Sequence, residues 1–265
     1  MKNFNTKRMW QVLKYDLLIN RRQNLATFAK SVLVLFIMFF IMFIAYTWHY
    51  PDGRVGKIGE GSATMVLLTI GFATIFYGSW ILRHMDTKQH RTAYLMLPAS
   101  PAEKMVARLL ITVVVMPLAC MVAIVAADML RWLVHITLGV GLNGSVALPT
   151  LRFISYAPWQ AIVICILGTL WAQSLYIAGG ALFTRRQWLL TGTGLIILAM
   201  MGGGMLTRAL DYMFDEALNK GFTINGDIVF WAFACKFTLF TLLNYWISYR
   251  FFRRTQVINN KWLNV

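Results

Sequence analysis

The sequence is poor in acidic residues and in cysteine. Its 265 residues include 10 Asp and Glu against 25 Lys and Arg, and only three Cys. The cysteines, Cys120, Cys165 and Cys235, stand singly in apolar runs, so their spacing indicates neither a disulfide framework nor a zinc site. We interpret all three as packing residues.

The sequence also lacks the motifs of nucleotide-hydrolysing and other hydrolytic enzymes. It contains no GxxxxGK[ST] phosphate loop, so we expect this chain to hydrolyse no nucleotide by itself. HExxH, GxSxG and paired carboxylates within the apolar runs are missing too. Asp86 and His90, four residues apart, are too few for a metal site, and we interpret them as solvated. We predict no catalytic residue, no metal site and no cofactor bound by this chain.

Apolar residues dominate what the chain does contain. It is 58% hydrophobic and 13% charged, with 18 Phe and 10 Trp. Water-soluble domains are nearer to about 45–50% apolar. We therefore predict an all-α integral membrane protein.

Six apolar runs approach or reach the roughly 20 residues that a bilayer-spanning helix needs. These predicted spans are residues 31–48, 63–82, 109–130, 159–183, 188–207 and 228–249. Pro117 is expected to kink the third span, and the pair Gly179–Gly180 in the fourth is expected to let helices approach closely.

The segments outside the spans are more polar. Residues 1–30 are basic and place Trp10, Leu13 and Leu17 on one helical face, which predicts an interfacial amphipathic helix. An amphipathic pattern predicts a helix on the outer surface at 208–221. Residues 131–158 are apolar, and their sequence leaves open a re-entrant segment or a loop lying on the membrane surface.

Positive charge is concentrated in alternate segments. Eighteen of the 25 Lys and Arg fall in residues 1–30, 83–108, 184–188 and the tail 250–265. Segments rich in Lys and Arg stay in the cytoplasm, so we predict that both termini are cytoplasmic. The net charge of +15 then reflects topology, and we expect no nucleic-acid partner.

The inner loop 83–108 carries both a helix start and an apolar cluster. Ser100 as N-cap, Pro101 and Glu103 predict a capping box, with a helix that runs directly into the third span. The residues just before it are apolar: Tyr94, Leu95, Met96 and Leu97, followed by Pro98. Either a partner covers this cluster, or it dips into the inner leaflet, where each nearby basic residue contributes about 1 kcal/mol of attraction to anionic lipid.

Three polar side chains within or near the spans are candidates for a translocation path or gate. Lys236 lies eight residues after Ile228, roughly 12 Å into its span. An ammonium at that depth costs about 2.5–3.5 kcal/mol, so it either lines the path, forms an outer gate with Asp128, or extends outward without a transport role. Gln173 lies near the middle of the fourth span. Normal transport by a Lys236→Met variant would remove the functional interpretation.

The stretch Leu97-Pro98-Ala99-Ser100-Pro101-Ala102-Glu103-Lys104 resembles the LP-x-S-x-x-E-K segment of exporter-type (type-two) ABC transporter permeases, chiefly bacterial proteins. The rest of the chain is similar only in architecture, and 131–158 is longer and more apolar than the resemblance implies. In that family the loop forms a coupling helix that docks on a separate ATPase subunit. The resemblance implies that Tyr94, Leu95, Met96, Leu97, Pro98, Ser100 and Glu103 form the docking and coupling site.

The resemblance further implies a permease subunit in the bacterial cytoplasmic membrane, paired as a homodimer or heterodimer. ATP would be bound by the partner ATPase, and the permeases would move a substrate by alternating access. The abundant Met and Phe would suit a lipid-like or amphipathic substrate, although ordinary helix packing would look the same. The alternative is a non-transporting assembly or anchoring protein that binds a cytosolic partner through 83–108.

Overall fold

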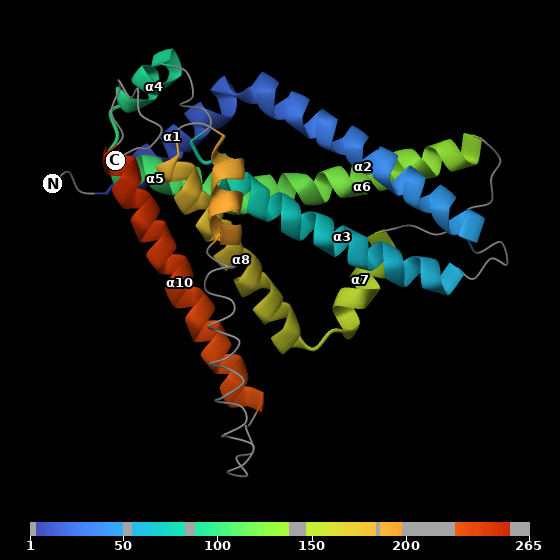
Figure 1. Cartoon of the computed structure of the whole chain (residues 1–265). Helices are drawn as coiled ribbons and strands as arrows, with labels where there is room; N and C mark the ends of the chain where they lie inside the picture. Colours follow the sequence, from blue (N-terminus) through green and yellow to red (C-terminus); the bar gives the residue numbers. More distant parts are fainter. Residues whose placement is uncertain are drawn as a thin grey trace, which may run out of the picture. The chain divides into compact units, whose positions relative to one another are not determined.

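The computed structural model describes residues 4–49, 55–82, 88–137, 147–183, 186–197 and 226–254. The elements of this described part are helices (Figure 1). In chain order they are α1 (Thr6–Ile19), α2 (Arg21–His49), α3 (Val55–Gly78), α4 (Lys88–Leu95), α5 (Pro101–Leu110), η2 (Ile111–Val115), α6 (Met116–Thr137), α7 (Ala147–Tyr156), α8 (Trp159–Leu182), the helix Gln187–Ile197, and α10 (Gly226–Arg254).

Four helical stretches of the described residues are long and apolar enough to cross a membrane. They are Arg21–Met42, Pro101–Val134, Trp159–Leu182 and Asp227–Arg254. The protein is therefore an all-α integral membrane protein, as its composition predicts. The second and fifth predicted spans correspond to shorter apolar helices, Ala63–Gly78 and Gln187–Ile197. Six spans and cytoplasmic termini stay predictions, and residues 198–207, the outer helix 208–221 and most of the basic tail lie outside the described residues.

The chain divides into two compact units. Unit 1 comprises Met1–Thr74 and Pro98–Ile162, and unit 2 comprises Ile75–Leu97 and Val163–Val265. The division falls within the predicted inner loop, between Leu97 and Pro98.

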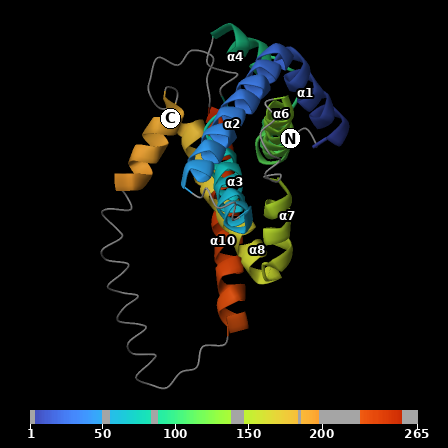
Figure 2. The ribbon, with the colours of Figure 1, turned by 90° about the vertical axis from the view of Figure 1, so that its right-hand side faces the viewer.

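In unit 1, α2 lies along α6 and α1 lies beside α5 (Figure 1). The buried positions of α2 and α6 recur at helical spacing, with Leu35 and Phe39 on α2 and Ala123 and Ala127 on α6. Small side chains such as alanine let helix backbones approach closely where apolar lipid supplies no hydrophobic driving force. Asn20 ends α1, and α2 begins at Arg21 in a new direction (Figure 2).

The helix predicted to run from Ser100 into the third span is confirmed. It is continuous through α5, η2 and α6, but it contains a π-helical turn that was not expected from the sequence. In this turn the Met116 N–H donates to the carbonyl of Ile111, five residues earlier. Pro117 has no N–H to donate to the carbonyl four residues before it, so the helix changes register just where that bond is missing.

Residues 131–158, left open from sequence, are largely helical where they are described. α6 continues to Thr137, and α7 occupies Ala147–Tyr156. α7 contacts α6 and carries exposed apolar side chains, among them Leu151 and Tyr156. Residues 138–146 lie outside the described part of the chain.

In unit 2, α8 packs tightly against its neighbours at glycines. A methyl group added at Gly180 would lie 2.6 Å from the carbonyl oxygen of Ser79, and one at Gly78 would lie 2.7 Å from the carbonyl oxygen of Gln173. Such distances leave no room for a side chain, so the predicted close approach at Gly179–Gly180 is confirmed. Between α8 and α10, the Asn244 amide donates a 2.9 Å hydrogen bond to Ser174 Oγ.

Candidate functional site

The start of α5 is built as the sequence predicts. Ser100 Oγ accepts a 3.2 Å hydrogen bond from the Glu103 N–H, and Glu103 Oε2 accepts a 2.8 Å bond from the Ser100 N–H. Pro101 occupies the first helical turn, where its missing N–H leaves no bond unmade. The predicted capping box is confirmed, and it fixes the backbone at the start of α5.

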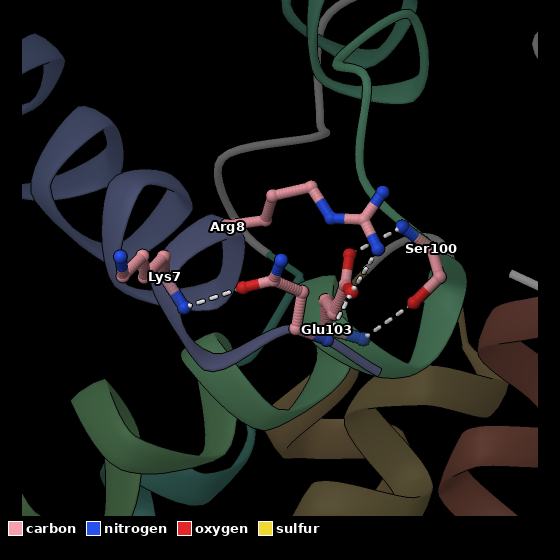
Figure 3. Close-up of polar contacts among 5 residues, drawn as sticks. Lys7, Arg8, Ser100 and Glu103 are labelled. Atoms are coloured by element: carbon pink, nitrogen blue, oxygen red, sulfur yellow. Dashed lines mark hydrogen bonds and ion pairs between the residues drawn. The ribbon is translucent and has the colours of Figure 1, made fainter. Parts of the chain in front are cut away.

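Glu103 also holds the beginning of α1, a role that its sequence neighbourhood does not indicate. Its Oε1 accepts a 2.8 Å hydrogen bond from the Asn5 N–H and lies 3.1 Å from Arg8 Nη2 (Figure 3). The carboxylate is completely buried. One side chain therefore satisfies backbone donors at the starts of two helices that are 98 residues apart in the chain.

A second link joins α1 to α5 further along both helices. Arg108 Nη2 donates a 2.7 Å hydrogen bond to Asp16 Oδ1, and both side chains are buried. Val12 and Leu13 are the buried apolar residues of α1. α1 is thus fixed to α5 by two polar links at either end of a small apolar contact. We call Glu103, Arg8, Asp16 and Arg108, with the Asn5 backbone, the α1–α5 clamp.

Burial raises the pKa of the Asp16 carboxyl to about 6, against the attraction and hydrogen bond of Arg108, which lower it. Desolvation outweighs the ion pair because the carboxylate loses most of its water when α1 docks. Asp16 Oδ2 is buried and accepts no hydrogen bond in the described structure. At neutral pH most Asp16 side chains are still ionised.

The apolar cluster at the end of α4 is only partly exposed. α4 ends at Leu95, in agreement with the restriction that Pro98 places on the preceding residue. Tyr94 is 2% exposed and Met96 is 78% exposed, whereas Leu95 and Leu97 are intermediate. Tyr94, expected on the surface, is covered by its own chain, so Met96 is the most accessible residue of the cluster.

The candidate translocation residues occupy different environments. Gln173 is fully buried on α8, within unit 2. Asp128, in unit 1, is buried and accepts hydrogen bonds from Arg131 Nε at 3.1 Å and Nη2 at 2.9 Å. Lys236 is exposed on α10, with its Nζ 5.9 Å from the ring centre of Phe233. The proposed gate between Lys236 and Asp128 stays a prediction.

Two buried polar residues were not predicted as functional or structural sites, although the sequence contains an indication of each. Arg131 stands three residues after Asp128, the spacing at which opposite charges meet on one helix. Asn244 is an amide within the sixth span, and a buried amide there needs a hydrogen-bond partner, which Ser174 provides.

Within the described part of the chain, no three His, Cys, Asp or Glu side chains are placed to hold a metal ion. The arrangement is structural instead: the inner loop leads into the capped start of α5, and α1 is held beside α5 by the clamp. No protein-family model matches the sequence, and neither does any of the curated proteins or solved structures compared with it.

Proposed function

We propose that the chain is a permease subunit of an exporter-type ABC transporter and that the loop 83–108 transmits movement from a separate ATPase subunit. The observation that carries the proposal is the single helical path from Pro101 to Val134, whose start is fixed by the capping box. In this proposal a force applied to the loop enters the helix at its capped start, Ser100. The segment that resembles the coupling loop of this family leads directly into that path.

The clamp adds a second reason for a mechanical role. Because Glu103 and Arg108 bind α1, any displacement of α5 carries α1 with it. The π-helical turn at Ile111–Val115 marks the place where the moving inner end can change its angle relative to the rest of α6. In this proposal two such chains, identical or different, lie in a bacterial cytoplasmic membrane with both termini inside. The substrate stays open.

The docking surface is centred on Met96. Its side chain is the most exposed of the apolar cluster, and an apolar side chain in an aqueous loop gains free energy when a partner covers it. Leu95 and Leu97 would line the edge of the contact, while Tyr94 supports it from beneath.

The test is purification of the full chain from its native membrane in mild detergent, followed by measurement of bound ATPase activity. We expect a nucleotide-binding subunit to copurify with the wild-type chain and to be lost from a Met96→Asp variant. Gln89→Asp is the matched control, since it adds the same charge at an exposed position of α4. A copurifying partner without ATPase activity would instead favour the interpretation as an anchoring protein. If Met96→Asp retains as much bound ATPase activity as Gln89→Asp, docking through Met96 is refuted.

A further inference from the structure

The helix α1 has two distinct faces. Its buried residues, Val12, Leu13 and Asp16, lie on the side that faces α5. The opposite face is exposed and consists of residues at helical spacing: Lys7, Trp10, Gln11, Lys14 and Leu18. We call these five residues the exposed face of α1. It combines cations with large apolar side chains, since Trp10 is 53% and Leu18 is 66% exposed.

Among the described residues, neither Lys7 nor Lys14 forms an ion pair with a carboxylate. Asp16 is the one acidic residue before Asp52, and it is buried against Arg108. Two further exposed cations, Arg21 and Arg22, follow at the start of α2. The surface is therefore basic as well as apolar, and its chemistry fits an anionic partner with an apolar layer beneath.

The chain itself places this face next to a membrane. α1 ends at Ile19, and after Asn20 the chain continues as α2, whose first ten residues include the cations Arg21, Arg22 and Lys30 and whose apolar run begins at Ser31. Cations beside a span lie at the headgroups, so the end of α1 lies at the headgroup level of the membrane. Where Lys side chains flank Trp or Leu at a membrane surface, the ammonium groups extend to the headgroups while the apolar side chains enter the acyl boundary.

We propose that the exposed face of α1 binds anionic phospholipid headgroups of the adjacent leaflet. Lys7 and Lys14 contact the phosphates, and Trp10 and Leu18 enter the acyl boundary. The opposite face stays on α5, so lipid bound to α1 also stabilises the clamp at Glu103 and Arg108. This binding is independent of whether the chain transports a substrate.

The experiment compares the full chain in nanodiscs of phosphatidylcholine alone and in nanodiscs of equal parts phosphatidylcholine and phosphatidylglycerol. The readout is hydrogen–deuterium exchange of the α1 amides, Thr6–Ile19. Each Lys near an anionic surface contributes about fivefold to the binding equilibrium. Two lysines therefore slow exchange by roughly 25-fold in the anionic nanodiscs, and added salt reduces the difference.

A Lys7→Gln/Lys14→Gln variant removes most of this lipid dependence, and both substitutions are at exposed positions where folding is not disturbed. Arg253→Gln/Arg254→Gln is the matched control, because it removes the same charge from exposed positions at the end of α10. Equal exchange in the two bilayers, or the same lipid effect in the Lys7/Lys14 variant, would overturn the proposal. If the α1 amides are instead protected only when two chains share one nanodisc, the exposed face of α1 binds a second copy of the chain. That result would also overturn the proposal.

Discussion

The α1–α5 clamp makes a specific prediction about Glu103. In the wild-type chain its two carboxylate oxygens accept from the Asn5 and Ser100 backbone N–H groups and lie against Arg8. Glu103→Gln keeps the size of the side chain but replaces one acceptor oxygen with an NH₂ donor. At least one of the buried N–H groups, or Arg8, then faces a donor instead of an acceptor.

The magnitude follows from these contacts. A hydrogen bond to a charged group contributes about 1.5–3 kcal/mol, so we expect Glu103→Gln to weaken the clamp by about 2–3 kcal/mol. Glu103→Ala leaves both backbone donors unsatisfied, and we expect a loss of about 3–5 kcal/mol. Arg8→Gln should cost at most about 1 kcal/mol, because Arg8 is 32% exposed and solvent screens its ion pair.

Hydrogen–deuterium exchange in the intact chain measures the effect at both helix starts. A loss of about 2–3 kcal/mol accelerates exchange by roughly 30- to 150-fold, both in the first turns of α1 and at the start of α5. Faster exchange at α5 alone would mean that Glu103 is only a helix cap and does not hold α1. A change below about fivefold at both sites, less than about 1 kcal/mol, would refute the reasoning altogether.

Three further predictions concern other contacts. The raised pKa of Asp16 means that the folded protein binds the Asp16 proton more tightly than the unfolded chain does. The stability contributed by this proton is therefore fully present below pH 3.8, the ordinary pKa, and is lost as the pH rises through about 6. The melting temperature should be higher at pH 5 than at pH 7, and Asp16→Asn should remove this part of the pH dependence. Gly180→Ala should destabilise the protein by about 1–3 kcal/mol in thermal unfolding, because its methyl group would overlap a backbone carbonyl, whereas Gly71→Ala, with nothing within 4 Å, should be harmless. Asn244→Leu should lower stability by about 0.6–2 kcal/mol through loss of the hydrogen bond to Ser174, and an unchanged melting temperature would show that this bond contributes nothing.

Several local features of the structure were predictable because they depend on neighbouring residues. The capping box of Ser100 and Glu103 needs only the spacing S-x-x-E, and Pro101 fits the first turn. The fourth span was predicted at 159–183 and α8 occupies Trp159–Leu182, since its apolar run is bounded by Pro158 and by charged residues. α2 extends ten residues before the predicted start of the first span, because hydropathy locates the apolar part of a helix and not its polar continuation.

Contacts between residues far apart in the sequence were harder to predict. Glu103 was predicted as a cap, but nothing in its sequence neighbourhood indicates that Asn5 and Arg8 complete its contacts. Tyr94 was expected to be exposed as part of the apolar cluster on the inner loop, yet it is buried. Asp128 was considered as a partner for Lys236, while Arg131, one helical turn away, was overlooked.

The sequence by itself determined that this is an all-α membrane protein, because the length and hydropathy of its apolar runs depend only on local composition and on the thickness of a bilayer. It also determined where α5 begins, because a capping box closes within four residues. Only the tertiary structure decided that α1 is fixed to α5, that Asp16 is buried against Arg108, and which face of α1 remains exposed. These contacts depend on the path of the chain through three dimensions, and the burial that shifts the pKa of Asp16 arises only when the two helices meet.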